Sequence, residues 1–507
     1  MSSSLLPAKL PEISRQLVAV FRRENFTVAG VSELLGPQAT AAWRRGEPAA
    51  VRRQAPEDSA LGVLIRVFIL GDAVSRATLA DILGESVVAT LCPGSANAAE
   101  VRITCDIIPH VIAGADHWVF SDKDASMVQK VAGAEHVLGV GAASLSLLDS
   151  VPRSSVDSLL DVGTGSGVQL LAQAPYAAHL TGTDIHRRAL DFAEATVLGA
   201  GLVDVELVQG SWFEPVAGMK FDRIVANPPF VVGLPEVGHV YRDSGFNLDG
   251  ASELMVSQVA DYLTEGGTAH LLAAWIHEDG ARWQQRIASW LPDNGVCAWV
   301  LQRDVADPEL YVSTWLSDES VDPRSPAGQE RTTLWLDHFA THKVSGIGFG
   351  FVAIQRLADD EPSDIVVEEL SQQFTDPLGD EVAEYFLRAG WLREQTQVSF
   401  ALATYQLRPG VAVEEVSVAD ESTGQGVVPA AKRIVRLDGP RFSHDIDEHV
   451  LAMLKGLHPN GLSLAEIVEL YCQAHGFDSD EVLVEMIGIM VDLIRHGLVL
   501  PAELIAD

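Results

Sequence analysis

The apolar residues 224–226 are followed at once by Asn227-Pro228-Pro229-Phe230. Each proline removes a backbone donor and fixes its own φ, so the pair must end a strand. Two interpretations are open. The pair is a stiff turn and nothing more, or its rigidity holds the polar Asn227 side chain at a reacting atom. What lies beside this segment in the fold decides between them.

A second segment, "SLLDVGTGSGVQLL", combines an acid with closely spaced glycines: Asp161, Gly163, Thr164, Gly165 and Gly167. Such glycines allow a tight turn and a close approach of the backbone to a ligand. A P-loop would need Gly-Lys-Ser/Thr here, and a GxGxxG dinucleotide fingerprint would need glycine where Val168 stands. A second acid, Asp184, follows 23 residues after Asp161 and can accept both ribose hydroxyls of an adenosine.

The elements around these segments alternate between short strands and helices. We expect strands near residues 158–162, 179–185, 205–210, 222–227, 268–274 and 296–302, with helices near 168–177, 187–200 and 253–266. This alternation predicts an α/β, Rossmann-like doubly wound parallel sheet with helices on both faces. Ligands of such sheets bind beyond the carboxyl ends of the strands, so Asn227 should share one crevice with the glycine loop.

The glycine loop and its two acids resemble motif I and the following acid of class I S-adenosylmethionine (SAM) methyltransferases. The resemblance implies SAM as cofactor, S-adenosylhomocysteine (SAH) as product and direct methyl transfer without a metal. It assigns cofactor binding to the loop residues and to Asp184, Ile185, Ser211 and Trp212. Relatives often carry Asp at the position of Ser211, and serine is the weaker acceptor.

The residues at 227–230 match the (Asn/Asp)-Pro-Pro-(Phe/Tyr/Trp) motif of methyltransferases that act on planar nitrogen. The resemblance implies that the Asn227 oxygen and the Pro228 carbonyl each accept a hydrogen bond from an NH2 group. Pro228 and Pro229 would hold both acceptors in place beforehand, and Phe230 would stack on the planar target.

Two families compete for the substrate. Phe120, followed by Ser121, and the segment "GVGAASLSLL" resemble the "methyltransferase small" domain of ribosomal-RNA guanine-N2 methyltransferases. This resemblance implies that Phe120 and Gly141 bind the cofactor and that Gly139 and Ala142 lie near it. Those enzymes usually have His where Val231 stands. HemK-type glutamine methyltransferases of release factors also resemble this chain, usually with Tyr in place of Phe230. The sequence favours an exocyclic amine of an RNA base over a protein glutamine; a third reading is a non-catalytic binding or scaffold module.

The whole chain has 507 residues and a formal net charge of -35, which opposes extended contact with phosphate backbones. Arginine pairs lie at 22–23, 44–45 and 52–53, within a nearly balanced N-terminal part. No apolar run reaches the ~18 residues that span a bilayer. The four cysteines are scattered, which favours a reducing cytoplasm and no metal site.

Three domains are expected: a helical, winged-helix-like arm at 1–95, the methyltransferase domain at 96–357, and an acidic α+β winged-helix-like domain at 358–507. The last would contact protein rather than DNA, because it is acidic. Tyr241, Arg242 and Asp243 are expected on the substrate side of the site, or as an internal ion pair.

Overall fold

The computed structural model describes residues 7–124, 127–128, 133, 135–234, 245–318, 321–370, 372 and 377–505. Contacts divide the chain into two compact units: residues 1–148 with 153–368, and residues 149–152 with 369–507. Among the described helices, none is long and apolar enough to cross a membrane. The three-domain division stays a prediction.

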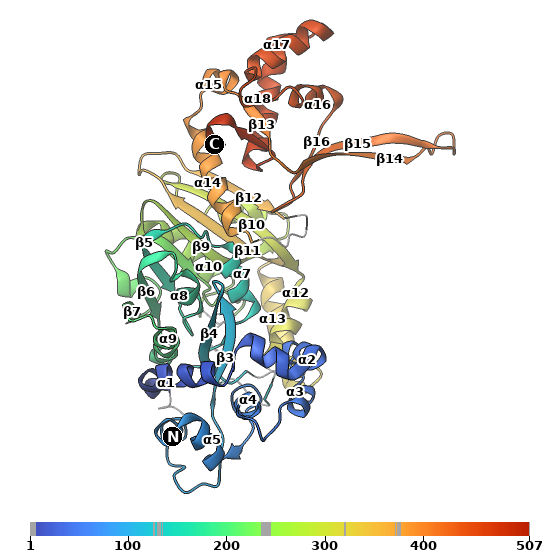
Figure 1. Cartoon of the computed structure of the whole chain (residues 1–507). Coiled ribbons are helices and arrows are strands. Elements are labelled where there is room, and N and C mark those ends of the chain that lie inside the picture. The colour runs from blue at the N-terminus through green and yellow to red at the C-terminus, as the bar shows by residue number, and fades with distance from the viewer. Residues whose placement is uncertain are drawn as a thin grey trace. The chain divides into compact units, whose positions relative to one another are not determined.

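The first unit is built on one eight-stranded sheet with the strand order β12-β10-β11-β9-β8-β5-β6-β7. Figure 1 labels β5, β6, β7, β9, β10, β11 and β12 of this sheet. In chain order the strands are β5 (Val156–Val162), β6 (Ala177–Asp184), β7 (Val205–Gln209), β8 (Phe221–Ala226), β9 (Leu263–Glu278), β10 (Val296–Ala306), β11 (Val344–Arg356) and β12 (Asp364–Glu369). From β5 the chain adds β6 and β7 toward one edge of the sheet and then β8 and β9 toward the other, so β5 lies between β6 and β8. The predicted α/β Rossmann-like class is confirmed.

The sheet is mixed rather than wholly parallel, which corrects the expectation. Strands β5 to β9 pair in parallel, but β11 lies between β9 and β10 and is antiparallel to both. Only the arrangement in space reveals this insertion, because a buried strand has the same residue pattern in either direction. The sheet also continues past residue 357, through the edge strand β12.

Helices α8 (Val168–Gln173), α9 (Arg187–Gly199), α10 (Gly250–Gln258) and α11 (Trp283–Ala288) follow individual strands, with the short helices η3 (Glu214–Val216) and η4 (Val259–Tyr262). The helix expected over 253–266 ends early, because β9 already begins at Leu263. Two further helices, α12 (Pro308–Asp318) and α13 (Pro326–Thr341), lie between β10 and β11. Segment 317–330 is rich in Asp, Ser, Pro and Gly, which predicts an exposed loop. This prediction is partly wrong, because Ser325 caps α13 inside the segment.

The N-terminal part is helical, as predicted: η1 (Pro7–Lys9), α1 (Leu10–Arg23), α2 (Val28–Arg44), α3 (Pro48–Gln54), α4 (Ala60–Leu64), η2 (Ile65–Ile69), α5 (Arg76–Leu83) and α6 (Glu85–Leu91). It adds the strands β1 (Val74–Ser75), β2 (Glu100–Val101), β3 (Cys105–Ile112) and β4 (Ala115–Asp122). Its core is continuous with the sheet unit, because Phe21 and Trp118 belong to the same buried cluster as Phe192 of α9. Helix α7 (Ala142–Ser150) leads from this part into β5.

The second unit contains α14 (Gly379–Glu394), α15 (Gln397–Leu402), β13 (Tyr405–Leu407), β14 (Val411–Ala419), β15 (Val427–Arg436), β16 (Ser443–Asp445), α16 (Glu448–Leu454), α17 (Leu464–His475), α18 (Ser479–Arg495), β17 (Val499–Pro501) and η5 (Ala502–Leu504). The residues "VSFALATYQL" at 398–407 predict a strand, but the segment is helical up to Leu402, because Thr396 and Ser399 form a capping box. The closing residues "LIRHGLVLP" predict a helix, a glycine stop and a short strand. This order is present: Gly497 has φ 66° between α18 and β17.

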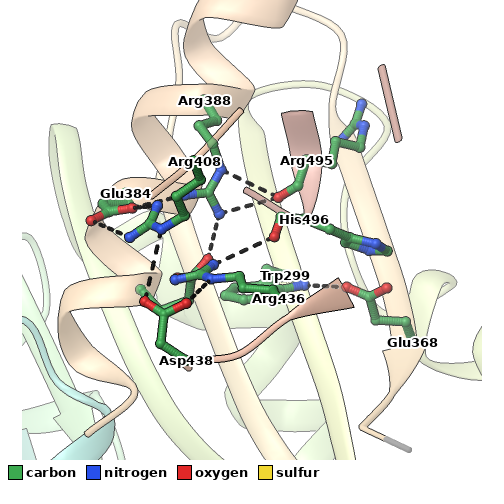
Figure 2. Close-up of polar contacts among 10 residues, drawn as sticks. Trp299, Glu368, Glu384, Arg388, Arg408, Arg436, Asp438, Arg495 and His496 are labelled. Atoms are coloured by element: carbon green, nitrogen blue, oxygen red, sulfur yellow. Dashed lines mark hydrogen bonds and ion pairs between the residues drawn. The ribbon is translucent and has the colours of Figure 1, made fainter. Parts of the chain in front are cut away.

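Buried charges hold the second unit together. Arg388 is 1% exposed, and its guanidinium lies 2.5 Å from Glu381 and 3.2 Å from Glu384. Arg436 contacts the other oxygen of Glu381 at 2.5 Å and pairs with Asp438 at 2.8 Å. Figure 2 shows these arginines beside Glu384 and Asp438. Each of these buried arginines is paired with carboxylates, so its charge is compensated, and we assign the cluster a structural role.

Candidate functional site

A cavity of about 340 Å³ lies at the carboxyl ends of β5, β6 and β8, inside the first unit. Its volume is that of a small-molecule site. Four segments that follow strands line the cavity: the glycine loop after β5, the end of β6, residues 210–212 after β7, and residues 227–229 after β8. Helix α7 and residues 135–139 complete the lining. The sequence therefore brings its two chemical motifs to one crevice, as the sheet topology requires.

The glycine loop is pinned to the neighbouring strand. The backbone N–H groups of Gly163 and Thr164 both donate to the Thr183 carbonyl, at 2.9 and 2.8 Å. Gly163 has φ 73°, and a Cβ built there meets no heavy atom within 4 Å, so its backbone borders open space. Gly167 has φ 81°, and a Cβ there would come within 3.3 Å of Ala193 in α9. The first glycine leaves room for a ligand, and the last allows helix packing.

Asp161 and Asp184 stand at the ends of β5 and β6. Asp161 is 1% exposed and accepts a hydrogen bond from the Thr164 hydroxyl at 2.6 Å. Burial raises the pKa of Asp161 to about 7, against the Thr164 hydrogen bond, which lowers it. Asp184 accepts from the N–H groups of Gly165 at 3.1 Å and His186 at 2.9 Å. Burial raises the pKa of Asp184 as well. Each acid therefore braces the loop that it borders.

Asn227 is half-buried, and its amide nitrogen donates to the Ser144 hydroxyl in α7 at 3.4 Å. Because the nitrogen faces Ser144, the amide oxygen is left to accept from a ligand. The next residues are held from the α12 side, where Tyr311 accepts a hydrogen bond from the Val232 N–H at 2.7 Å. The proline segment is thus anchored at both ends, by α7 and by Tyr311.

Most residues expected at the site line this cavity: Gly141, Asp161, Gly163, Thr164, Gly165, Asp184, Ile185, Ser211, Trp212, Asn227, Pro228 and Pro229. Gly139 lines it too, whereas Ala142, Gly167 and Phe230 do not. Phe230 instead packs against the buried cluster around Val231 and Val232. Residues 241–243 lie outside the described residues. Ligand roles for the lining residues remain predictions.

Phe120 is a correction. It is completely buried in the N-terminal core, not in the cavity lining, and its backbone N–H donates to the Thr196 hydroxyl at 3.1 Å. In β4 it pairs with Ile107 of β3, so its side chain faces the core of the N-terminal part. A phenylalanine in an apolar strand meets the same core-facing pattern whether or not a ligand lies nearby, so the motif alone misplaced it.

Ser144 and Gln169 are among the lining residues that the sequence did not predict. Gln169 is 4% exposed, and its amide nitrogen donates to the Ser144 carbonyl at 2.8 Å. The available signal was a polar residue at the start of an otherwise apolar helix, "VQLL". Its meaning depends on α7, whose position the sequence pattern does not give. In the part of the chain that the structure describes, no group of three His, Cys, Asp or Glu side chains could hold a metal ion.

Comparison with known proteins identifies the segment that carries this site. Residues 137–274 match the model of the methyltransferase small domain. Residues 23–100 and 383–501 match two models described as domains of unknown function, DUF7059 and DUF7782. These two segments precede and follow the methyltransferase match in the sequence, and their descriptions name no substrate.

The chain is similar to a release factor glutamine methyltransferase of Aliivibrio fischeri, with 40% identity over 183 residues, 32% of this chain and 60% of that protein. A protein of the same name from Buchnera aphidicola is 33% identical over 130 residues, 23% of this chain and 46% of that protein. A bifunctional methyltransferase of Rickettsia bellii is 37% identical over 92 residues, 17% of this chain and 16% of that protein. The matches thus span at most 60% of these curated relatives.

A solved 16S rRNA N2 G1207 methyltransferase of T. Thermophilus, in complex with AdoMet and guanosine, matches 48% of this chain and 65% of its own. The identity is 17% and the TM-score 0.26, values too low to carry an argument about substrate. The family match and the sequence relatives, together with a glycine loop and Asn-Pro-Pro segment in one cavity, identify residues 137–274 as a class I SAM-dependent methyltransferase domain.

Proposed function

We propose that this protein transfers a methyl group from SAM to a planar NH2 nitrogen, and that the nitrogen belongs to the side-chain amide of a protein glutamine. The orientation of Asn227 carries the first part. Asn227 lines the cavity and its amide nitrogen donates to the Ser144 hydroxyl at 3.4 Å, an arrangement in which its oxygen can accept from an NH2 group. The Pro228 carbonyl is a second acceptor on the same rigid segment.

The cavity suits the cofactor. The backbone of Gly163 and Gly141 borders open space, and Asp184 offers carboxylate oxygens for ribose hydroxyls. When bound, SAM supplies an electrophilic methyl group, which the target nitrogen takes up by displacement at carbon as the sulfonium–methyl bond breaks and one proton leaves the nitrogen. Asn227 holds the NH2 group and favours a more tetrahedral nitrogen, because a delocalised lone pair is a poor nucleophile. No residue is required as a strong general base.

Two observations favour a protein glutamine over an RNA base. Curated relatives of 33% and 40% identity are named release factor glutamine methyltransferases. A net charge of -35 repels a phosphate backbone but not a protein surface. The named relatives reverse the preference for an RNA base that was predicted from the sequence.

An exocyclic amine of an RNA base is the second candidate. It is favoured by the arginines of the N-terminal part, such as Arg22 and Arg44, which could contact RNA locally although the whole chain is acidic. Planar NH2 groups of bases and amides present the same donors to Asn227, so the site alone suits both.

Radiolabelled-methyl transfer from SAM to a purified release factor, measured in parallel with transfer to ribosomal subunits, tests the proposal. We expect label on the release factor, located on a glutamine by mass spectrometry. Label confined to ribosomal RNA would favour the second candidate and overturn the first. The Asn227→Ala variant serves as the inactive control, and Asn460→Ala, an exposed asparagine of the second unit, as the matched active one.

A further inference from the structure

A buried glutamine amide at the edge of the cavity makes a hydrogen bond through its nitrogen but not through its oxygen, among the described residues. Gln169 stands in the first turn of α8, directly after the glycine loop, and is 4% exposed. Its amide nitrogen donates to the Ser144 carbonyl at 2.8 Å. A carbonyl can only accept, so the nitrogen must be the atom at Ser144 and the orientation of the amide is determined.

The amide oxygen of Gln169 is the other half. It is buried and has no hydrogen-bond partner among the residues that the structure describes. A buried acceptor without a donor is costly, and native structures leave few of them, so each one calls for a partner or a functional explanation. Because Gln169 lines the cavity, a donor on the ligand is the economical explanation.

The sheet order indicates which donor this is. Asp184 ends β6, the glycine loop follows β5, and Asn227 follows β8, so the cavity runs from the ribose side past the loop to the target side. SAM carries three kinds of hydrogen-bond donor: the adenine amine, the ribose hydroxyls and the ammonium of its methionine group. The first two belong to the adenosine, on the Asp184 side. Gln169 belongs with Ser144 and Asn227, since Ser144 contacts both side chains.

We propose that the Gln169 amide oxygen accepts a hydrogen bond from the ammonium of the methionine group of SAM. The assignment rests on the proposed function, because it presupposes SAM in the cavity. In it, one amide joins the cofactor to α7: its nitrogen donates to Ser144, which contacts Asn227, and its oxygen binds the ammonium at the far end of the chain that carries the reacting sulfonium. Gln169 is then a cofactor-binding residue, and Ser144 is a positioning residue.

The test compares two ligands that differ by one group: SAH, and the SAH analogue in which only the amino group is replaced by hydrogen. Titration calorimetry measures both affinities for the wild-type chain and for Gln169→Leu. A hydrogen bond to a charged donor predicts that the substitution weakens SAH by about 10- to 100-fold. The affinity for the deaminated analogue should stay within about twofold, because that ligand never makes the bond.

Gln169→Glu distinguishes the side-chain oxygen, as acceptor for the ligand, from the side-chain nitrogen, which donates to the Ser144 carbonyl. It retains an acceptor oxygen but cannot donate to the Ser144 carbonyl, so it should keep the preference for SAH over the analogue. Equal weakening of both ligands by Gln169→Leu would show that Gln169 only supports α7, and would overturn the proposal. Unchanged affinity for both ligands would overturn it too. If the wild-type chain binds neither ligand, the proposed function itself fails, a result distinct from either of these.

Discussion

In the proposed function the transfer chemistry depends on Asn227, whose amide nitrogen donates to the Ser144 hydroxyl at 3.4 Å. We expect Asn227→Ala to lower methyl transfer by about 10²- to 10³-fold, the usual loss for a preorganised hydrogen-bonding group. SAM affinity should change by less than about twofold, because Asn227 faces the target. Single-turnover transfer and calorimetry measure the two quantities; a comparable loss of SAM binding would place Asn227 in the cofactor site instead.

Asp161 makes stability depend on pH. Its folded-state pKa is raised to about 7 by burial, whereas an unperturbed aspartate titrates at 3.8. Between these values the folded chain binds the proton and the unfolded chain does not, so stability falls as pH rises from about 4 to about 7. Asp161→Asn keeps an acceptor for Thr164 and removes the titration, so it should lose less stability between pH 5 and pH 8.

Thermal melting at pH 5 and pH 8 of the wild-type chain, Asp161→Asn and a control variant measures how much stability each loses between the two pH values. The control is Asp157→Asn in the same strand, whose side chain is 80% exposed and pays no such desolvation cost. The same pH response in the wild-type chain and in Asp161→Asn would contradict the assignment.

At the scale of elements, α12 lies outside the cavity lining yet supports the proline segment. Tyr311 is 1% exposed, and its hydroxyl accepts from the buried Val232 N–H at 2.7 Å. Tyr311→Phe leaves that donor unpaired, at a cost of about 1–3 kcal/mol in unfolding free energy. We expect slower transfer with SAM affinity retained, because the segment after β8 is loosened while the glycine loop is not.

Turnover and cofactor affinity of Tyr311→Phe, measured side by side, check the expectation. Tyr262→Phe is the matched control, since that ring stacks on Phe213 and does not line the cavity. Wild-type turnover in Tyr311→Phe would mean that the two prolines alone suffice to hold Asn227.

For the whole molecule, the two compact units have separate cores, so we expect two transitions in scanning calorimetry. SAH at 100 times its dissociation constant should stabilise only the first unit, by about 2.7 kcal/mol. Arg388→Ala breaks a buried charge cluster in the second unit and should lower only the other transition, by roughly 10 °C. A single transition that responds to both changes would show that the units unfold together.

The fold class and the two motifs were predictable because they depend on local physics. Alternating apolar runs predict strands and helices, glycines at positive φ predict a turn, and the proline pair predicts a strand end. The parallel strands β5 to β8 and the shared crevice at their carboxyl ends follow from these. Three features could not be predicted, because each depends on contacts between distant segments: the direction of the strands beyond β9, the extension of the sheet to β12, and the core shared by Phe21 and Phe192.

The sequence by itself determined a glycine loop suited to a nucleoside cofactor, and by resemblance it predicted a rigid amide and carbonyl suited to a planar nitrogen. The tertiary structure alone decided which atoms are free to act. It turned the Asn227 nitrogen toward Ser144, buried Phe120 in a core and placed the Gln169 amide between α7 and the cavity. The reason is that Ser144, the partner of both amides, lies far from Gln169 and Asn227 in the sequence, so only folding brings these groups together.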